Sequence, residues 1–583
     1  MFSTRKFQKI LLMVCCQSLL ACHQILLAED ATFNRPVAVA SNGAFGFIGN
    51  HRGSAITVID SQSLESRSIQ GDWQGLVDLG LVPASNRLLV ITQSPPQIVD
   101  INADSTHSKE SRPMALPGIP AKLAISMDSQ FACISMTWKH SVCIVKLVEG
   151  RLPDESRSEN ISLGFQPKEV LTLANGMFLI ADAFGGQLAV IDAGSAKIVA
   201  THRILGHHIG GLARDDSQQT IAITHQKLSI VAQTTRDDIH WGTLIQNLVS
   251  VVPESQLLDP NANITRSVQK IPLGDVDNGA ADPSGIVAWD GHVAIAVSGT
   301  NQLAFRADSK SLVHYKEVER LPTRVSRFGD SKIMSINTLS NTVSIFDWRG
   351  DRLQLVGELG TSRTLDTNED RGEAAFFSAS LSHDGWMSCN SCHVEVHTPD
   401  LLTDTMGDGR FGNPKRIPSL FNVAETGPWT WNGRENNLEG QIEKTLNSTM
   451  HRDPSSRENG LSDSIVATDI AAFLRKQKMA KEIPVASEKL SHGQILFKTR
   501  GCVRCHRPEM HYTSPETYDV GVVDEAGESQ FNPPSLEGLA HRRAYFHDAR
   551  FKSIADLLRS HPEPTASWTS DEISAMELLL GSL

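Results

Sequence analysis

The sequence has 583 residues, of which 40% are hydrophobic and 21% are charged, with 42 Gly and 26 Pro. This length accommodates about three to five domain-sized units, and the composition excludes a disordered chain, a collagen or a coiled coil. The net charge of -12 excludes the basic footprint of a protein that binds nucleic acid or an anionic membrane. We therefore expect a multidomain globular protein without a nucleic-acid partner.

The first 28 residues are typical of a secretory signal peptide. Basic residues precede an apolar stretch over residues 10–27, and polar residues interrupt that stretch, which argues against a membrane span. Two cleavage sites are open: one after Ala28 and one before Cys22, where the sequence resembles a lipoprotein box. Both predict export, and we expect a periplasmic protein in an oxidising compartment.

Residues 33–362 contain a repeat of short apolar runs that each end in an acidic turn. Four such runs end at Asp60, Asp100, Asp192 and Asp347. The first two lie 40 residues apart, and the third follows the first by 132, or three periods of about 44 residues. This period is the length of one four-stranded propeller blade, whereas a β-sandwich has no reason for a fixed period. Counting the preceding strands predicts a seven-bladed β-propeller.

One stretch of this region is longer than the repeat requires. An insertion of about residues 234–286 lies between the fifth and sixth units. Within it, residues 241–251 have a helical pattern.

Two cysteines flank a predicted hairpin in the third unit. Cys133 and Cys143 lie on its two strands, and export makes a disulfide between them possible. Two buried thiols are the alternative.

After Gly360 the pattern changes from strands to helices. The chain predicts helices over Ile465–Lys476 and Ser491–Lys498, and a last helix that begins with Thr569 and Glu572 in capping-box spacing. We divide this helical part into two cytochrome c domains, at 372–480 and 487–583.

Each helical domain contains one Cys-x-x-Cys-His motif. The first comprises Cys389, Cys392 and His393, and the second comprises Cys502, Cys505 and His506. Two thiols about a helical turn apart can add to the two vinyl groups of a haem, and the following histidine then ligates the iron. Zinc is excluded because 109 residues lie between the two cysteine pairs, far more than a zinc ribbon has. The sequence thus predicts two covalently bound haem c groups, called haem 1 and haem 2 in chain order.

The sequence resembles two known families. Residues 33–362 resemble seven-bladed propellers of the YVTN type, and residues 372–583 resemble the bacterial dihaem cytochrome c peroxidases and MauG-like enzymes. The landmarks of the second resemblance are Leu381-Ser382, Pro418-Ser419-Leu420, Trp431-Asn432-Gly433-Arg434, Leu438 to Gln441, Pro534-Ser535-Leu536 and Tyr545-Phe546-His547-Asp548. The resemblance implies that haem 1 reacts and that haem 2 passes electrons to it.

Individual site residues follow from this resemblance. Trp431 matches the tryptophan that relays electrons between the haems, with an ordinary core residue as the alternative. Gln441 matches a glutamine on the distal side of haem 1, and His451 stands where the family has an acid-base glutamate. His561 stands where the family has the distal ligand of haem 2, a methionine or a tyrosine. We therefore expect haem 2 to be bis-histidine, with Met576 as an alternative ligand.

Two departures from the family pattern concern haem 1. The loop Met406–Gly409 lacks the distal histidine of the peroxidases, so haem 1 is either open or capped by His451 or Met450. Arg416 replaces the asparagine that binds an interhaem calcium ion, which puts calcium in doubt.

Two functions remain open. One is a peroxidase-like oxidoreductase that takes hydrogen peroxide or an oxidisable substrate and draws electrons from a small partner such as a c-type cytochrome. The other is a non-peroxidatic electron-transfer protein whose propeller docks a partner or substrate.

Overall fold

The computed structural model describes residues 26–28, 32–71, 73–83, 85–107, 113–153, 158–452, 462–479, 487–561 and 567–583. The predicted signal peptide falls outside these ranges except for Leu26–Ala28, which form strand β1. Within the described residues, no helix combines the length and the apolar composition that a bilayer span requires.

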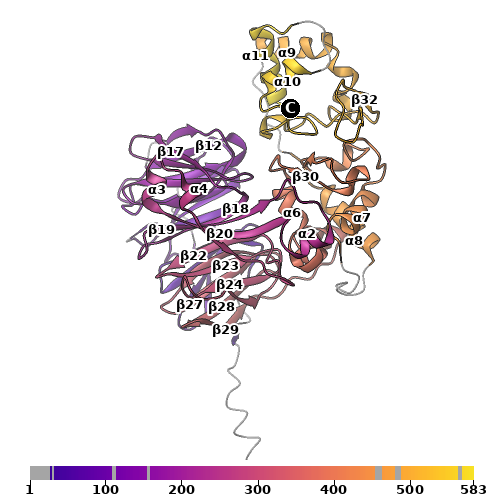
Figure 1. The fold of residues 1–583 in the computed structure, drawn as a ribbon. Helices are drawn as coiled ribbons and strands as arrows, with labels where there is room; N and C mark the ends of the chain where they lie inside the picture. Colours follow the sequence, from indigo (N-terminus) through magenta and orange to yellow (C-terminus); the bar gives the residue numbers. More distant parts are fainter. Residues whose placement is uncertain are drawn as a thin grey trace, which may run out of the picture.

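Seven four-stranded antiparallel sheets form the N-terminal part, which confirms the predicted seven-bladed propeller (Figure 1). The first four blades comprise β2–β5 (Pro36–Ser41, Phe45–Asn50, Ala55–Asp60, Ser66–Gln70), β6–β9 (Gln74–Leu81, Arg87–Ser94, Pro96–Asn102, Pro113–Ala115), β10–β13 (Lys122–Ile125, Phe131–Met136, Ser141–Lys146, Ser158–Ser162) and β14–β17 (Pro167–Thr172, Met177–Asp182, Gln187–Asp192, Lys197–Arg203). The last three comprise β18–β21 (His207–Asp215, Thr220–Leu228, Ile245–Pro253, Gln269–Pro272), β22–β25 (Pro283–Trp289, His292–Val297, Gln302–Arg306, His314–Glu317) and β26–β29 (Pro322–Phe328, Lys332–Asn337, Thr342–Arg349, Arg352–Leu359).

The blades close into a ring through their first strands. Each of these strands contacts that of the next blade, and β26 of the seventh blade contacts β2 of the first. The Thr338 hydroxyl donates to the Pro36 carbonyl across this closure at 2.8 Å. β1 adds a fifth, parallel strand beside β29, and cleavage after Ala28 would remove it.

Two of the four repeated aspartates form the turns that the sequence pattern indicates, whereas Asp100 and Asp347 lie inside β8 and β28. Asp60 ends β4, and its carboxylate accepts hydrogen bonds from the backbone amides of Gln62 and Ser63, both at 2.9 Å. Asp192 ends β16 and accepts from the Gly194 amide in the same way. An aspartate that bonds the backbone two residues later reverses the chain toward the outer strand.

The predicted helix over residues 241–251 is wrong. Ile245–Pro253 form β20, the third strand of the fifth blade, which pairs with β19 and β21. The extra length therefore lies inside this blade: α2 (Arg236–His240) precedes β20, and α3 (Glu254–Leu258) and α4 (Ile264–Ser267) follow it. The valine-rich segment is buried between neighbouring strands, and this tertiary packing overrides the apparent helical period.

The predicted disulfide is also wrong, because both cysteines are free. In the pairing of β11 with β12, Cys133 lies opposite Ile144, and Cys143 lies opposite Ile134. A register offset of one residue places the two thiols on opposite faces of the sheet. Each is packed in a different hydrophobic cluster.

The first helical domain follows the propeller and lies beside it (Figure 1). Its elements are α5 (Asn368–Phe376), η2 (Ala379–Leu381), η3 (His383–Gly385), α6 (Cys389–Cys392), η4 (Val394–Val396), β30 (Leu402–Thr403), η5 (Met406–Asp408), β31 (Lys415–Arg416), η6 (Val423–Glu425), α7 (Leu438–Ser448) and α8 (Asp463–Leu474). α5 packs closely on α8 at Gly372, where a Cβ atom would lie 1.9 Å from the Asp469 carbonyl oxygen.

The second helical domain forms the end of the chain. It comprises α9 (Glu488–Thr499), η9 (Cys502–Arg504), η10 (Pro508–Met510), β32 (Tyr518–Asp519), β33 (Gln530–Phe531), η11 (Leu539–His541), α10 (Ile554–Ser560) and α11 (Ser570–Gly581). The predicted capping box is present: the Thr569 hydroxyl accepts from the Glu572 amide, and the Glu572 carboxylate accepts from the Thr569 amide. The predicted apolar face of α11 is buried against α9 and α10.

Candidate functional site

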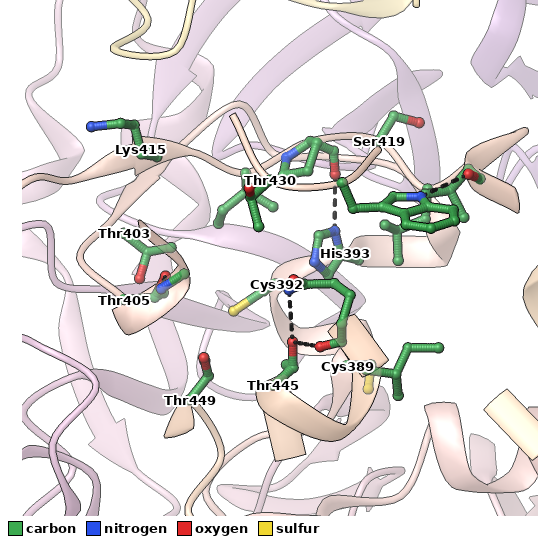
Figure 2. Close-up of a pocket in the computed structure, with 18 of the residues that line it drawn as sticks. Cys389, Cys392, His393, Thr403, Thr405, Lys415, Ser419, Thr430, Thr445 and Thr449 are labelled. Atoms are coloured by element: carbon green, nitrogen blue, oxygen red, sulfur yellow. Dashed lines mark hydrogen bonds between the residues drawn. The ribbon is translucent and has the colours of Figure 1, made fainter. Parts of the chain in front are cut away.

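The first Cys-x-x-Cys-His motif forms one short helical turn that ends in its histidine. α6 spans Cys389 to Cys392, and the backbone amide of His393 donates to the Cys389 carbonyl at 2.9 Å. Both thiols are free and half-buried. Figure 2 shows Cys389, Cys392 and His393 grouped at one side of a cavity.

A backbone carbonyl holds the His393 ring. His393 Nδ1 lies 2.9 Å from the Pro418 carbonyl oxygen, which leaves Nε2 as the ring nitrogen for a ligand. Burial lowers the pKa of His393 to about 4, and it raises the pKa of both thiols to about 12. The imidazole is therefore neutral, the form that binds iron.

The cavity has a volume of about 350 Å³ and lies between the helical domains and the propeller. Most of its walls belong to the first helical domain, and the fifth propeller blade adds Leu228, Thr234 and Leu244. Among the described residues that line it, His393 is the sole histidine.

Of the residues expected on the distal side of haem 1, some line the cavity and one does not. Gln441 lines the cavity, and its buried Oε1 has no hydrogen-bond partner among the described atoms. Met450 also lines it, with 3% of its side chain exposed. His451 does not line it, because its Nε2 donates to the Thr234 carbonyl at 2.8 Å.

A polar wall of the cavity contains Asp408 and Lys415. The Asp408 carboxylate accepts a hydrogen bond from the Asn413 amide and lies 3.8 Å from the Lys415 ammonium. That ammonium also pairs with Asp524 of the second helical domain at 3.0 Å. The wall therefore links the two domains.

Arg416 forms a buried ion pair at the junction of the two helical domains. Its Nη1 lies 2.9 Å from the Asp400 carboxylate, and each side chain is 3% exposed. Its Nε donates to the Phe546 carbonyl at 3.0 Å. A guanidinium thus occupies the position at which the resemblance implies a calcium ligand.

Trp431 lies between the cavity and the second helical domain. Its ring lines the cavity, and its Nε1 donates to the Arg416 carbonyl at 2.9 Å. The Arg416 guanidinium lies over the ring at 5.2 Å, and the His547 ring lies edge-on at 6.3 Å. The indole therefore contacts residues on both sides of the junction.

The second motif repeats the geometry of the first. The His506 amide donates to the Cys502 carbonyl at 2.9 Å, and His506 Nδ1 lies 2.9 Å from the Tyr512 carbonyl oxygen. Burial lowers the pKa of His506 to about 4. Cys502 and Cys505 form no disulfide and are half-buried.

His561 lies at the end of α10, near the second motif. Its amide donates to the Leu557 carbonyl at 2.8 Å, and its ring lies edge-on to Phe546 at 5.9 Å. Besides burial and the Tyr512 carbonyl, the charge interaction with His561 also affects the pKa of His506 and lowers it. Met576 is instead one of the buried residues of α11, with 1% of its surface exposed.

The residues around the first motif fit a haem. The two thiols and His393 Nε2 would supply its covalent and axial attachments, and a bound ligand would supply a partner for the buried, unpartnered Gln441 Oε1. Arg416 and Arg542 also line the cavity and can pair with the propionates. The Arg542 Nε has no partner among the described atoms.

Several propeller residues at this site were missed by sequence analysis. Gln226, Asn247 and Asp282 hydrogen-bond the loop that carries the first motif, and so does His207. No local signal could have found them, because each is more than 100 residues distant from its partner. His207 begins β18 and is buried.

Among the described residues, one group has metal-ligand geometry outside the haem motifs: His240, His383 and Asp384. His240 Nδ1 lies 2.6 Å from the Asp384 carboxylate, but Arg236 Nε lies 3.3 Å from His383 Nε2. Since a guanidinium already occupies this nitrogen, we interpret the group as a polar contact between the propeller and the first helical domain.

The helical part also matches known proteins. Residues 368–482 match the family model described as di-haem cytochrome c peroxidase, so this region carries a domain of that family. The methylamine utilization protein MauG of Methylorubrum extorquens is 24% identical, over 32% of this chain and 66% of its own. Cytochrome c551 peroxidase of Nitrosomonas europaea is also 24% identical, over 36% of this chain and 78% of its own.

Among solved structures, a chain of Kuenenia stuttgartiensis hydrazine synthase matches with a TM-score of 0.46 at 15% identity, covering 56% of this chain and 99% of that chain. A streptogramin B lyase matches with a TM-score of 0.42 at 10% identity, covering 56% and 95%. The seven-bladed architecture rests on the sheet topology itself.

The buried Arg416–Asp400 pair generates a stability prediction. Arg416→Met should lower the free energy of unfolding of the helical part by about 3–5 kcal/mol, because it leaves a buried carboxylate without its partner. Lys478→Met is the control: it breaks an exposed pair with Glu425 and should cost about 0–1 kcal/mol. Urea unfolding followed at the haem absorbance measures both, and equal losses would contradict the prediction.

Proposed function

We propose that this protein is an exported dihaem c-type oxidoreductase that reacts at haem 1, bound by Cys389, Cys392 and His393. The observation that carries this proposal is the cavity beside the first motif. It has one histidine among its described lining residues, and Gln441 on its wall has a buried amide oxygen without a partner among the described atoms. These features suit an iron with one protein ligand and one open face.

The chain's own residues would then control access and protons. A haem with an open face supplies peroxide binding and the storage of oxidising equivalents. The Gln441 amide would orient peroxide through hydrogen bonds, and Asp408, the carboxylate on the cavity wall, would carry a proton from one peroxide oxygen to the other. His451 is less suited to this role, since it donates to the Thr234 carbonyl.

Haem 2 would supply electrons. Cys502, Cys505 and His506 attach it, and His561 is the proposed sixth ligand because it lies close to His506. Trp431 is the proposed relay, since its ring lines the first cavity and contacts His547 of the second domain.

The partners and the location follow from the same proposal. Hydrogen peroxide or an oxidisable substrate would react at haem 1, and a small electron-transfer protein such as a c-type cytochrome would donate electrons. The two relatives are named for a peroxidase and for methylamine utilization, which agrees with this class of reaction. Export to the periplasm, with or without a lipid at Cys22, rests on the N-terminal sequence.

An electron-transfer protein without peroxidase activity is the second candidate. It is favoured by Met450, a buried thioether on the cavity wall that could ligate the iron and close the open face. The propeller would then serve to dock a partner or substrate.

The spectrum of the haem-loaded protein separates the two candidates. We expect a mass that exceeds the polypeptide by two haems, a high-spin ferric signal from haem 1, and consumption of peroxide by the half-reduced protein with a change in haem absorption. Asp408→Asn should slow this consumption by about 10²–10⁴-fold if Asp408 carries the proton. Two low-spin haems and no reaction with peroxide would leave the electron-transfer candidate.

The relay role of Trp431 has a matched control in Trp429, which lines the same cavity but donates to Val423 instead. Trp431→Phe should leave both haem spectra nearly unchanged and slow interhaem electron transfer, because it removes the indole at the junction. Trp429→Phe should change neither. Flash or stopped-flow kinetics measures the transfer, and an unchanged rate in Trp431→Phe would reduce Trp431 to packing.

The ligand role of His561 is tested by His561→Ala. Loss of the imidazole should convert haem 2 from low-spin to high-spin and shift its reduction potential, because the iron loses its sixth ligand. His492→Ala, at an exposed position of α9, should alter neither property. A low-spin haem 2 with an unshifted potential in His561→Ala would show that another residue is the ligand.

A further inference from the structure

The loop that carries the first haem motif is held by the propeller, not only by its own domain. Trp386, at the start of this loop, lies against Gly242, Gly274 and Gly279 of the propeller. A Cβ atom at Gly279 would lie 2.2 Å from the Trp386 Cα, so only glycine permits this approach. The Asn247 side chain donates to the Trp386 carbonyl at 3.1 Å.

Asp282 makes the most direct contact with the motif. It precedes β22 and is 1% exposed. Its Oδ2 accepts from the Ser388 hydroxyl at 2.5 Å, and its Oδ1 accepts from the Ser391 hydroxyl at 2.6 Å. Ser388 precedes Cys389, and Ser391 lies between the two cysteines, so one carboxylate spans the haem-binding turn.

The neighbours of Asp282 leave its charge without a lysine or arginine counter-ion among the described ion pairs. Its ion pair among the described residues is with His208, whose Nδ1 lies 3.8 Å from Oδ1 and also bonds the Gln226 side chain at 2.8 Å. His207 donates to the Ser391 carbonyl at 3.0 Å. Burial lowers the pKa of His207 to about 3, so this imidazole is neutral and adds no positive charge.

We propose that Asp282 is a positioning residue for haem 1: it orders the Cys389–Cys392 turn through Ser388 and Ser391, and its buried negative charge lowers the reduction potential of haem 1. The charge of the iron centre changes by one unit on reduction, and a fixed negative charge in a water-poor environment stabilises the more positive, oxidised form. Outer hydrogen bonds and charges tune a metal centre in this way. This proposal rests on the attachment of haem 1 at the first motif, but not on peroxidase activity.

The charge is tested with Asp282→Asn in the haem-loaded full-length protein. Asparagine has the same shape and tolerates the left-handed backbone of this position, where φ is 54°. The potential of haem 1 should rise and that of haem 2 should not move. Asp347→Asn, which alters a buried carboxylate of the seventh blade that accepts from Ser331, should move neither. An unchanged haem 1 potential in Asp282→Asn would overturn the proposal.

The positioning role is tested through haem attachment. The mass of the wild-type protein is measured first, because it gives the number of bound haems. A wild-type protein without haem 1 would contradict the proposed attachment itself, not the role of Asp282. If Asp282→Asn lacks haem 1 while Asp347→Asn retains both haems, the carboxylate is needed to order the turn. Asp282→Glu should then restore both the attachment and the low potential, and its failure to restore them would overturn the proposal.

Discussion

The buried polar contact between the propeller and the Cys389–Cys392 turn is the constraint on which the arrangement of this protein depends. Asp282, His207, Gln226 and Asn247 place hydrogen-bonding groups on one short loop, and their contacts with it are buried. A buried polar group that loses its partner costs about 1–3 kcal/mol, and a buried charge costs more. The propeller and the first helical domain therefore fix each other's position, and the propeller forms part of the surroundings of the first Cys-x-x-Cys-His motif.

A second set of contacts connects the three parts at the opposite side of the first motif. Arg543 of the second helical domain pairs with Asp182 of the fourth blade, and its amide donates to Asp400 of the first domain at 2.6 Å. Trp138 of the third blade lies edge-on to His397 at 5.4 Å and to His541 at 5.1 Å. Because these groups come from all three parts, the two helical domains are held in one orientation against the propeller.

The two haem motifs share their local geometry and differ in their surroundings. In both, the histidine Nδ1 lies 2.9 Å from a backbone carbonyl oxygen. The first motif faces a cavity, whereas the second lies beside a second histidine, His561. If haem occupies both, the same attachment chemistry yields a reactive group and an electron carrier, and the difference comes from residues distant in sequence.

The sequence predicted the elements that depend on local patterns. The period of about 40–44 residues predicted seven blades, because each blade is one repeat of four strands. Capping residues and apolar spacing located α8, α9 and α11, since a helix is determined largely by its own residues. The Cys-x-x-Cys-His spacing is local in the same way, and it predicts the two haem sites.

The tertiary structure alone decided what depends on register and on distant partners. In the third blade, a register offset of one residue places Cys133 and Cys143 on opposite faces of the sheet. In the fifth blade, packing between strands makes residues 245–253 a strand. The sequence predicted His451 on the distal side of haem 1. In the structure, His451 instead donates to the Thr234 carbonyl of the propeller insertion. Asp282 lies 106 residues from Ser388, so only the folded chain could show that its charge belongs to the first haem motif.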